Sequence, residues 1–276
     1  MDRKLDSRSR TENLIVLTSG GLDSFVARYF ARAHGFENIR SLWINIGQPY
    51  AEKEMSAIQR FPFPVEIIEC FTVDPIFGNV PTINQQVIPG RNLLFAIIAA
   101  SMGGERIWLG ALEGEMHTDV GSRDKTPEFF SLTTGLLSFT FKPRSEEVIL
   151  ETPFQNMTKA EMITWALQNG ISPNQLRSTS TCYHPEHDRC GQCGACFKRW
   201  IALILNEIDE DYRYNPWISE YARRMLNDMK QAIHIGQYSH YSRKRVKETF
   251  EALRRVRELD PEEWRIYSLA MERDNV

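Results

Sequence analysis

The strongest chemical signal in this sequence is a cluster of four cysteines within fifteen residues: Cys182, Cys190, Cys193 and Cys196. Four thiolates at such short spacing can close a tetrahedral site around Zn²⁺, and Gly191 and Gly194 permit tight turns between them. An iron–sulfur cluster is the competing interpretation, because four cysteines can hold one as well. The fifth cysteine, Cys70, lies alone in an apolar stretch and is typical of a protein core. We expect a structural zinc site with no ligand position open to substrate.

A second signal is the segment Ser19-Gly20-Gly21-Leu22-Asp23-Ser24, which follows an apolar stretch and precedes a helical pattern. Its glycines let the backbone approach an anion closely, and the start of a helix offers unpaired N–H groups and a positive dipole end. The serine hydroxyls can donate hydrogen bonds to phosphate oxygens. A carboxylate such as Asp23 repels phosphate unless Mg²⁺ stands between them. The segment therefore predicts a loop for a magnesium-bound nucleotide, and the alternative is an ordinary strand–turn–helix corner with a Ser or Asp cap.

The elements that must position these residues alternate along the first part of the chain. Apolar stretches predict strands at Leu14–Thr18, Ile39–Ile46, Val65–Glu69 and Arg106–Gly110. Helical patterns predict helices at Asp23–His34, Ala51–Arg60 and Arg91–Met102. This alternation favours an α/β fold with a doubly wound parallel sheet that helices cover on both faces.

Helices dominate the prediction for the second part of the chain. Residues 111–126 lack periodicity and are expected to form a lid or binding loop, and Pro127–Phe139 is expected to be a helix. Thr158 and Glu161 form a capping box at the start of a helix that runs to Gln168. The chain is helical and charged beyond Arg199, with Pro216 and Pro261 as expected helix starts.

An apolar stripe in this tail recurs at spacings of four residues: Trp217, Tyr221, Met225 and Met229. Such a stripe predicts that the tail packs as helices on the main domain or on a second subunit, rather than forming a flexible linker.

The composition excludes several classes of protein. Apolar residues make up 42% and charged residues 25% of the 276 residues, which is close to the average of soluble globular proteins. No stretch reaches the ~18 apolar residues of a membrane helix, and the polar N-terminus lacks the core of a secretory signal. A formal charge of −3 gives no global positive field for nucleic acid. We expect a cytoplasmic protein with neither a membrane nor a nucleic acid as its partner.

The glycine loop resembles the pyrophosphate loop of the N-type ATP pyrophosphatases, which have a HUP-like fold. Together with the cysteines, an ordered set of motifs from about Leu14 to Arg199 resembles the 7-cyano-7-deazaguanine synthase (QueC-like) family. These motifs are Gly47-Gln48, Pro89-Gly90-Arg91-Asn92, Thr158-Lys159-Ala160-Glu161 and Ser180-Thr181-Cys182-Tyr183. The chain departs from the family at Asn45-Ile46, where the family has Asp-Tyr, and at Ser122–Thr126, where it has Tyr-Pro-Asp-Cys-Arg. The last ~75 residues also exceed the family's usual length.

The resemblance implies an ATP-dependent C–N ligase that forms AMP and pyrophosphate. It would adenylate the carboxylate of 7-carboxy-7-deazaguanine, let ammonia form the amide, and use a second ATP to give the nitrile, 7-cyano-7-deazaguanine (preQ0). ATP and Mg²⁺ are assigned to the loop residues Ser19 to Ser24 and to Gly110. The catalytic assignments are Asp23, Arg91 and Lys159, and the substrate assignments are Asp119, Arg123 and Lys125. The zinc would be held by Cys182, Cys190, Cys193 and Cys196.

Arg91 and Lys159 could instead be exposed residues in the first turn of a helix, with no role in catalysis. The three residues assigned to the substrate could likewise lie in a solvated loop without binding it. The expected organisation is a disordered lead-in at 1–12, the ATP pyrophosphatase domain at 13–170, a zinc-binding segment at 171–206 and a helical extension at 207–276.

Two other functions stay open at this point, and both use the same loop. One is a ligase that joins the deazaguanine to a protein amine, for example in antiviral defence. The other is an ATP-dependent tRNA thiolase or other tRNA-modifying enzyme, against which the lack of an unbroken basic face counts. The expected partners are the deazapurine, ATP, ammonia or another amine, and a second copy of the chain in a homodimer.

Overall fold

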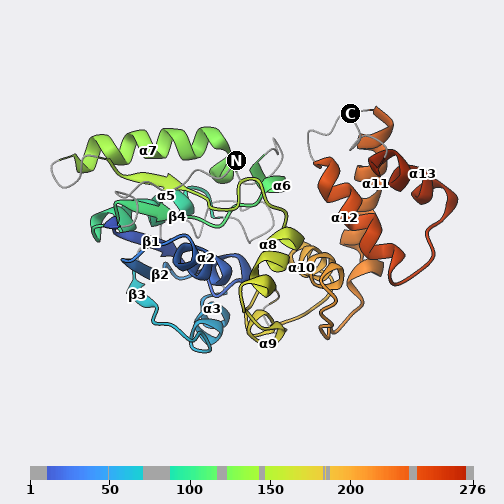
Figure 1. Cartoon of the computed structure of the whole chain (residues 1–276), viewed down its shortest axis with the longest axis horizontal. Coiled ribbons are helices and arrows are strands. Elements are labelled where there is room, and N and C mark those ends of the chain that lie inside the picture. The colour runs from blue at the N-terminus through green and yellow to red at the C-terminus, as the bar shows by residue number, and fades with distance from the viewer. Residues whose placement is uncertain are drawn as a thin grey trace. The chain divides into compact units, whose positions relative to one another are not determined.

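The computed structural model of the chain (Figure 1) describes residues 11–48, 50–70, 88–116, 123–142, 147–182, 184, 187–235 and 241–271. The chain divides into two compact units. The sheet unit comprises Met1–Ala111, Ser122–Pro153 and Asn174–Ser180, and the helical unit comprises Leu112–Gly121, Phe154–Pro173 and Thr181–Val276. The units interleave along the chain, whereas the sequence suggested consecutive domains.

Within the residues that the structure describes, the sheet unit has five parallel strands in the order β3-β2-β1-β4-β5. In chain order the strands are β1 (Leu14–Leu17), β2 (Ile39–Asn45), β3 (Glu66–Glu69), β4 (Arg106–Trp108) and β5 (Ile149–Glu151). The central strand β1 is buried along its whole length, as its uninterrupted apolar sequence predicts. The doubly wound α/β fold that the sequence indicated is confirmed.

In the described part of the sheet unit the helices are α2 (Leu22–Ala33), α3 (Ala51–Ile58), α5 (Arg91–Ser101), η1 (Arg123–Lys125), α7 (Pro127–Phe141) and α9 (Pro173–Arg177). Helix α7 runs along the edge strand β5 (Figure 1). The hydroxyl of Thr134 exchanges hydrogen bonds of 3.0 and 3.1 Å with the backbone of Leu150, and that of Ser138 does the same with Val148. These side chains occupy backbone groups that an edge strand otherwise leaves unpaired.

The helical unit contains α6 (Glu113–Met116), α8 (Lys159–Gln168), α10 (Gly194–Leu205), η2 (Pro216–Ile218), α11 (Glu220–Ile235), α12 (Arg243–Arg254) and α13 (Pro261–Met271). One apolar core joins α10 to the tail, and its buried members include Phe197, Trp200, Met225, Met229 and Phe250. Trp217 and Tyr221 pack against the same core. The stripe predicted from sequence therefore docks the tail, and α10 is its partner.

The helix starts predicted from sequence can be compared with those in the structure. Thr158 caps α8 in a capping box with Glu161, as predicted, and Pro261 opens α13. Pro216 opens the short 3₁₀ helix η2 rather than an α-helix. Helix α10 begins at Gly194, earlier than the helical pattern beyond Arg199 indicated, because the Cys193 side chain accepts a hydrogen bond from the N–H of Cys196 as an N-cap. The expected loop at 111–126 contains α6 and η1, and its residues 117–122 lie outside the described residues.

Candidate functional site

The glycine loop lies at the carboxyl end of β1, and the strand order reverses between β1 and its neighbour β4. In doubly wound sheets this switch point is where ligands bind. Gly20 has a φ of +69°, and a Cβ atom placed on it would lie 2.7 Å from the carbonyl oxygen of Glu54. Only glycine fits this position, since any side chain is both strained and blocked. The tight turn leads directly into the N-terminus of α2, which begins at Leu22.

Hydrogen bonds within the loop hold its shape. The Ser24 hydroxyl donates to the carbonyl of Gly21 at 3.1 Å and accepts from the N–H of Ser19 at 3.3 Å. The N–H of Ser180 donates to the carbonyl of Gly20 at 2.8 Å, so the segment before the first cysteine packs on the loop. Ser24, predicted as a phosphate donor, is buried here, and its hydroxyl serves the loop backbone.

Asp23 lies beside the end of strand β4. A Cβ atom placed on Gly110 would lie 3.3 Å from the Cβ of Asp23. Two residues that the sequence assigned to ATP, 87 positions apart, thus meet at the switch point of the sheet. A carboxylate at the first turn of a helix, next to a glycine loop, is a suitable ligand for the Mg²⁺ of a bound nucleotide.

A buried polar network stands next to the loop, and sequence reasoning did not find its central residue, Glu54. The Glu54 carboxylate accepts hydrogen bonds from Trp43 Nε1 at 2.8 Å and from Gln48 Nε2 at 2.9 Å. Burial raises the pKa of Glu54, and the Trp43 and Gln48 hydrogen bonds and the charge of Arg91 oppose that rise. Gln48 comes from the Gly47-Gln48 motif, so the only sequence signal for this network was that motif.

Arg91 lies between two acidic groups of the sheet unit. Its Nη1 donates to the hydroxyl of Tyr50, and its guanidinium carbon lies 5.9 Å from the centre of the Phe95 ring. Burial raises the pKa of Asp124 in η1, and the charge of Arg91 counteracts this. The Oδ1 atom of Asp124 is buried and has no hydrogen-bond partner in the part of the chain that the structure describes. Arg91 is therefore set in a charged network rather than on an open helix surface.

The predicted site residues fall into both units. The sheet unit holds the loop, Asp23, Gly110 and Arg91, and η1 contains both Arg123 and Lys125 beside Asp124. The helical unit holds Lys159, at the first position of α8, and the four cysteines. Asp119 lies outside the described residues.

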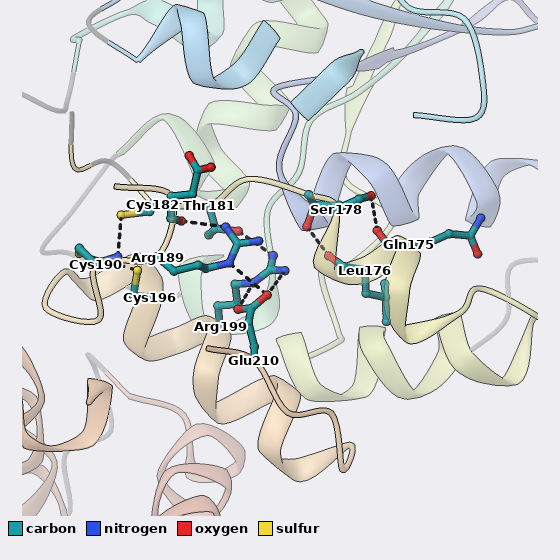
Figure 2. A network of polar contacts seen from close by, with 12 residues as sticks. Gln175, Leu176, Ser178, Thr181, Cys182, Arg189, Cys190, Cys196, Arg199 and Glu210 are labelled. Atoms are coloured by element: carbon teal, nitrogen blue, oxygen red, sulfur yellow. Dashed lines mark hydrogen bonds and ion pairs between the residues drawn. The ribbon is translucent and has the colours of Figure 1, made fainter. Parts of the chain in front are cut away.

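The four cysteine sulfur atoms lie within 4.8 Å of one another. Figure 2 labels three of these cysteines, Cys182, Cys190 and Cys196. Three of these cysteines are buried, and the Sγ atoms of Cys190 and Cys196 are 3.9 Å apart. Backbone N–H groups point at the sulfurs, for example from Gln192 to Cys190 at 3.3 Å and from Cys196 to Cys193 at 3.4 Å. Hydrogen bonds from the thiols of Cys182 and Cys196 hold the pKa of Cys193 far below its usual range, at about 3. The hydrogen bonds with Cys182 and Cys193, together with burial, raise the pKa of Cys196, so a thiolate at Cys193 is favoured beside a protonated neighbour.

These distances fit a zinc ion. Four sulfurs at about 2.3 Å from a tetrahedral Zn²⁺ stand about 3.8 Å from each other, which matches the spacing of Cys190 and Cys196. A four-iron cluster fills the space between its thiolates with iron and sulfide, and needs them farther apart.

Arg199 anchors the segment around the cysteines (Figure 2). Its side chain is fully buried and donates two hydrogen bonds of 2.8 Å to the carboxylate of Glu210 and one of 3.0 Å to the hydroxyl of Thr181. Burial alone raises the pKa of Glu210, but Arg199 and Arg189 outweigh it and the pKa is lowered. A fully paired, bidentate geometry is what a buried ion pair requires. Arg199, part of the family motif, therefore acts in the structure of the cysteine segment.

Within the described residues, none of the helices combines the length and the apolar character needed to cross a bilayer.

Comparison with known proteins gives a consistent family. The family model for the queuosine biosynthesis protein QueC matches residues 13–207. A 7-cyano-7-deazaguanine synthase from Marinobacter nauticus is 26% identical over 74% of this chain and 98% of its own length. One from Chlorobium phaeobacteroides is 27% identical over 73% of this chain and 97% of its own. Among solved structures, an NH3-dependent NAD synthetase from Campylobacter jejuni aligns with 97% of this chain and 85% of its own, at 12% identity and a TM-score of 0.39.

Proposed function

The chain belongs to the QueC family of queuosine biosynthesis proteins, and from this premise we propose that it adenylates the carboxylate of 7-carboxy-7-deazaguanine and then amidates it. The observation that carries the proposal is the glycine loop at the switch point of the sheet, with Asp23 and Gly110 side by side. Dehydration of the amide to 7-cyano-7-deazaguanine, with a second ATP, is the further step that the curated relatives' name suggests.

The chemistry needs activation because a carboxylate is a poor electrophile. Its oxygen attacks the α-phosphorus of ATP, the bond to pyrophosphate breaks, and an acyl adenylate forms. Ammonia then attacks the acyl carbon, and AMP leaves with the electron pair of the C–O bond. The loop N–H groups and the N-terminus of α2 bind the phosphates, and Arg91 and Lys159 are the proposed cations that offset negative charge in these steps.

Two metal ions belong to this proposal. Mg²⁺ would be held by Asp23 and would neutralise phosphate charge. Zn²⁺ would be held by Cys182, Cys190, Cys193 and Cys196, with four protein ligands and a structural role. The sulfur spacing supports zinc over a four-iron cluster.

The test is incubation with 7-carboxy-7-deazaguanine, ATP, Mg²⁺ and ammonium. We expect AMP, pyrophosphate and the amide or nitrile, identified by mass. Asp23→Asn should abolish AMP formation, whereas Asp209→Asn, a surface change in the helical unit, should not. ADP and phosphate as products would contradict the proposal.

A second candidate differs only in the amine. The family model ends at residue 207, yet the chain continues through α11, α12 and α13. These added helices favour a specialised partner, so a ligase that joins the deazaguanine to a protein amine is the alternative. Mass spectrometry of proteins encoded beside this one, after co-expression, should then find an added deazaguanine.

A further inference from the structure

Asp124 of η1 is a buried acid beside Arg91, and the proposed reaction gives it no role. Its Oδ1 atom is buried and makes no hydrogen bond within the described part of the chain. Burial raises the pKa of Asp124, and the charges of Arg91 and Lys125 offset only part of that rise. An ionised carboxylate with an unpartnered oxygen costs folding free energy, so its presence calls for a functional reason.

The backbone around Asp124 is fixed on both sides. On one side, Nδ2 of Asn92, the second residue of α5, donates to the carbonyl of Asp124 at 3.5 Å. On the other side, the hydroxyl of Thr126 donates to the carbonyl of Arg123 at 3.1 Å and accepts from the N–H of Phe129 at 3.3 Å, as the N-cap of α7. Asp124 is therefore held in a defined place beside the first turn of α5.

Helix α5 has no cap of its own. It begins directly after Gly90, which has no side chain that could cap it. The free N–H groups of a first helical turn favour a negative charge nearby. Although burial raises the pKa of Asp124, a hydrogen bond from the backbone N–H of Asn92 opposes the rise. The Asp124 carboxylate thus takes the place of the missing cap, one residue away from Arg91.

Arg91 is connected in turn to the glycine loop through Glu54 of α3. Burial raises the pKa of Glu54, and the charge of Arg91 is among the causes that oppose this rise. The backbone of Glu54 packs on the loop, because its carbonyl oxygen would lie 2.7 Å from a Cβ atom placed on Gly20. All these residues belong to the sheet unit, so the connection from Asp124 to the loop lies within one compact unit.

We propose that Asp124 is the positioning residue for Arg91: its carboxylate holds the guanidinium between η1 and α3, in the orientation that serves adenylation. This inference rests on the proposed function, because Arg91 is a cation proposed for that step. A neutral residue at position 124 would leave Glu54 as the acid that pairs with Arg91. The guanidinium would then shift toward α3, and less of its charge would act on the phosphates. Asp124 acts through Arg91 and contacts neither ATP nor the substrate.

Asp124→Asn removes the charge and keeps the shape of the side chain. Its kcat for substrate-dependent exchange of pyrophosphate into ATP should fall by up to about 100-fold, the effect of a misplacement of ~1 Å at a reacting group. The KM for ATP should stay near the wild-type value, because the glycine loop is unchanged. Since a buried charge is removed, the variant should resist urea at pH 8 as well as wild type or better. Glu128→Gln, an equal change of charge on an exposed residue at the start of α7, should match wild type in both measurements.

A double-mutant cycle with Arg91→Ala tests whether Asp124 acts through Arg91. Residues that act as a unit have effects that do not add. Asp124→Asn should therefore lower the exchange rate in the wild-type background and cause no further loss in the Arg91→Ala background. If Arg91→Ala leaves too little exchange to measure, Arg91→Lys provides the same cycle.

Three results would overturn the inference. The first is a wild-type kcat in Asp124→Asn, and the second is a pair of losses that multiply in the double variant. The third is an unfolded or less stable Asp124→Asn protein, because a purely structural role predicts it and a positioning role does not. A wild-type protein without pyrophosphate exchange would instead refute the proposed function, and this inference with it.

Discussion

At the scale of single residues, the conformation of the glycine loop depends on the lack of a side chain at Gly20. Gly20→Ala places a methyl group at positive φ and within 2.7 Å of the Glu54 carbonyl oxygen. We expect a loss of ~2 kcal/mol or more in the free energy of unfolding, since backbone strain of this kind costs about 1–3 kcal/mol before the clash is added. Thermal and urea unfolding measure it.

Gly170 provides the matched control for this variant. It has a φ of +83°, but nothing lies within 4 Å of a Cβ atom placed on it. Gly170→Ala should therefore show the strain at positive φ without the clash, and should retain ATP binding. Equal destabilisation of the two variants would mean that the contact with Glu54 is not what makes Gly20 necessary.

Among the site residues, sequence identified those that carry a motif and missed those that act through distant contacts. The glycine loop and the cysteines can be recognised from sequence by their spacing, because each set lies within a short stretch of chain. Glu54 and Asp124 carry no such signal, because their partners Trp43 and Asn92 are 11 and 32 positions away. Only the fold brings them together.

Replacement of Cys190 removes one of the four sulfur atoms of the proposed zinc site. Cys190→Ser should lower the zinc content below the ~1 ion per chain expected for the wild type and destabilise the helical unit, since binding energy at such a site is also folding energy. Elemental analysis and thermal unfolding with and without chelator provide the measurement. Cys70→Ser, which lies outside the cluster, should leave the zinc content unchanged. Iron and labile sulfide in place of zinc would contradict the assignment.

At the scale of elements, the contact between α12 and the start of α8, where Glu248 pairs with the hydroxyl of Thr158, predicts a pH dependence. Burial raises the pKa of Glu248 to about 7 in the folded protein, above its ordinary value of 4.5. Its protonated form therefore stabilises the fold, fully below about pH 4.5, and this stability is lost as pH rises through 7. The loss amounts to at most about 3 kcal/mol.

Glu248→Gln should remove that part of the pH dependence. The amide stays neutral and can still hydrogen-bond with Thr158, so the variant should unfold at higher urea than wild type at pH 8 and at about the same urea at pH 5. Urea unfolding across this range measures the difference. A wild-type-like loss of stability between pH 5 and pH 8 in the variant would show that Glu248 is not the titrating group.

Element prediction succeeded where a pattern is long enough to repeat. The capping box at Thr158 marks the start of α8 locally, and the apolar stretch of β1 marks a central strand. Strand β5 has only three residues and α9 only five, too few for any period to emerge. The backbone of β5 is fixed instead by a partner outside the strand, because the hydroxyl of Thr134 on α7 pairs with the backbone of Leu150.

At the scale of the whole molecule, the tail and the cysteine segment share one core. Removing residues 208–276 would expose Phe197, Trp200 and Ile201, which are buried against the tail helices. We expect the truncated protein to be insoluble or to associate, because exposed apolar patches of this kind promote association. Sedimentation and light scattering test this. A soluble truncated protein with wild-type mass and turnover would contradict it.

The expected homodimer has a candidate contact face on α7. Leu132, Leu136 and Phe139 are exposed by 75%, 50% and 83%, and their spacings of four and three residues place them on one face of the helix. The opposite face, with Phe130 and Leu137, is already buried in the sheet unit. A stripe on a single helix can pair with its own copy about a two-fold axis, so it suits a symmetric dimer.

Leu136→Glu should then convert a dimer to a monomer in sedimentation equilibrium, since it places a charge at the centre of the contact. Ser131→Glu, on the same helix but off the stripe, should leave the dimer intact, and a wild-type monomer would refute the proposed contact.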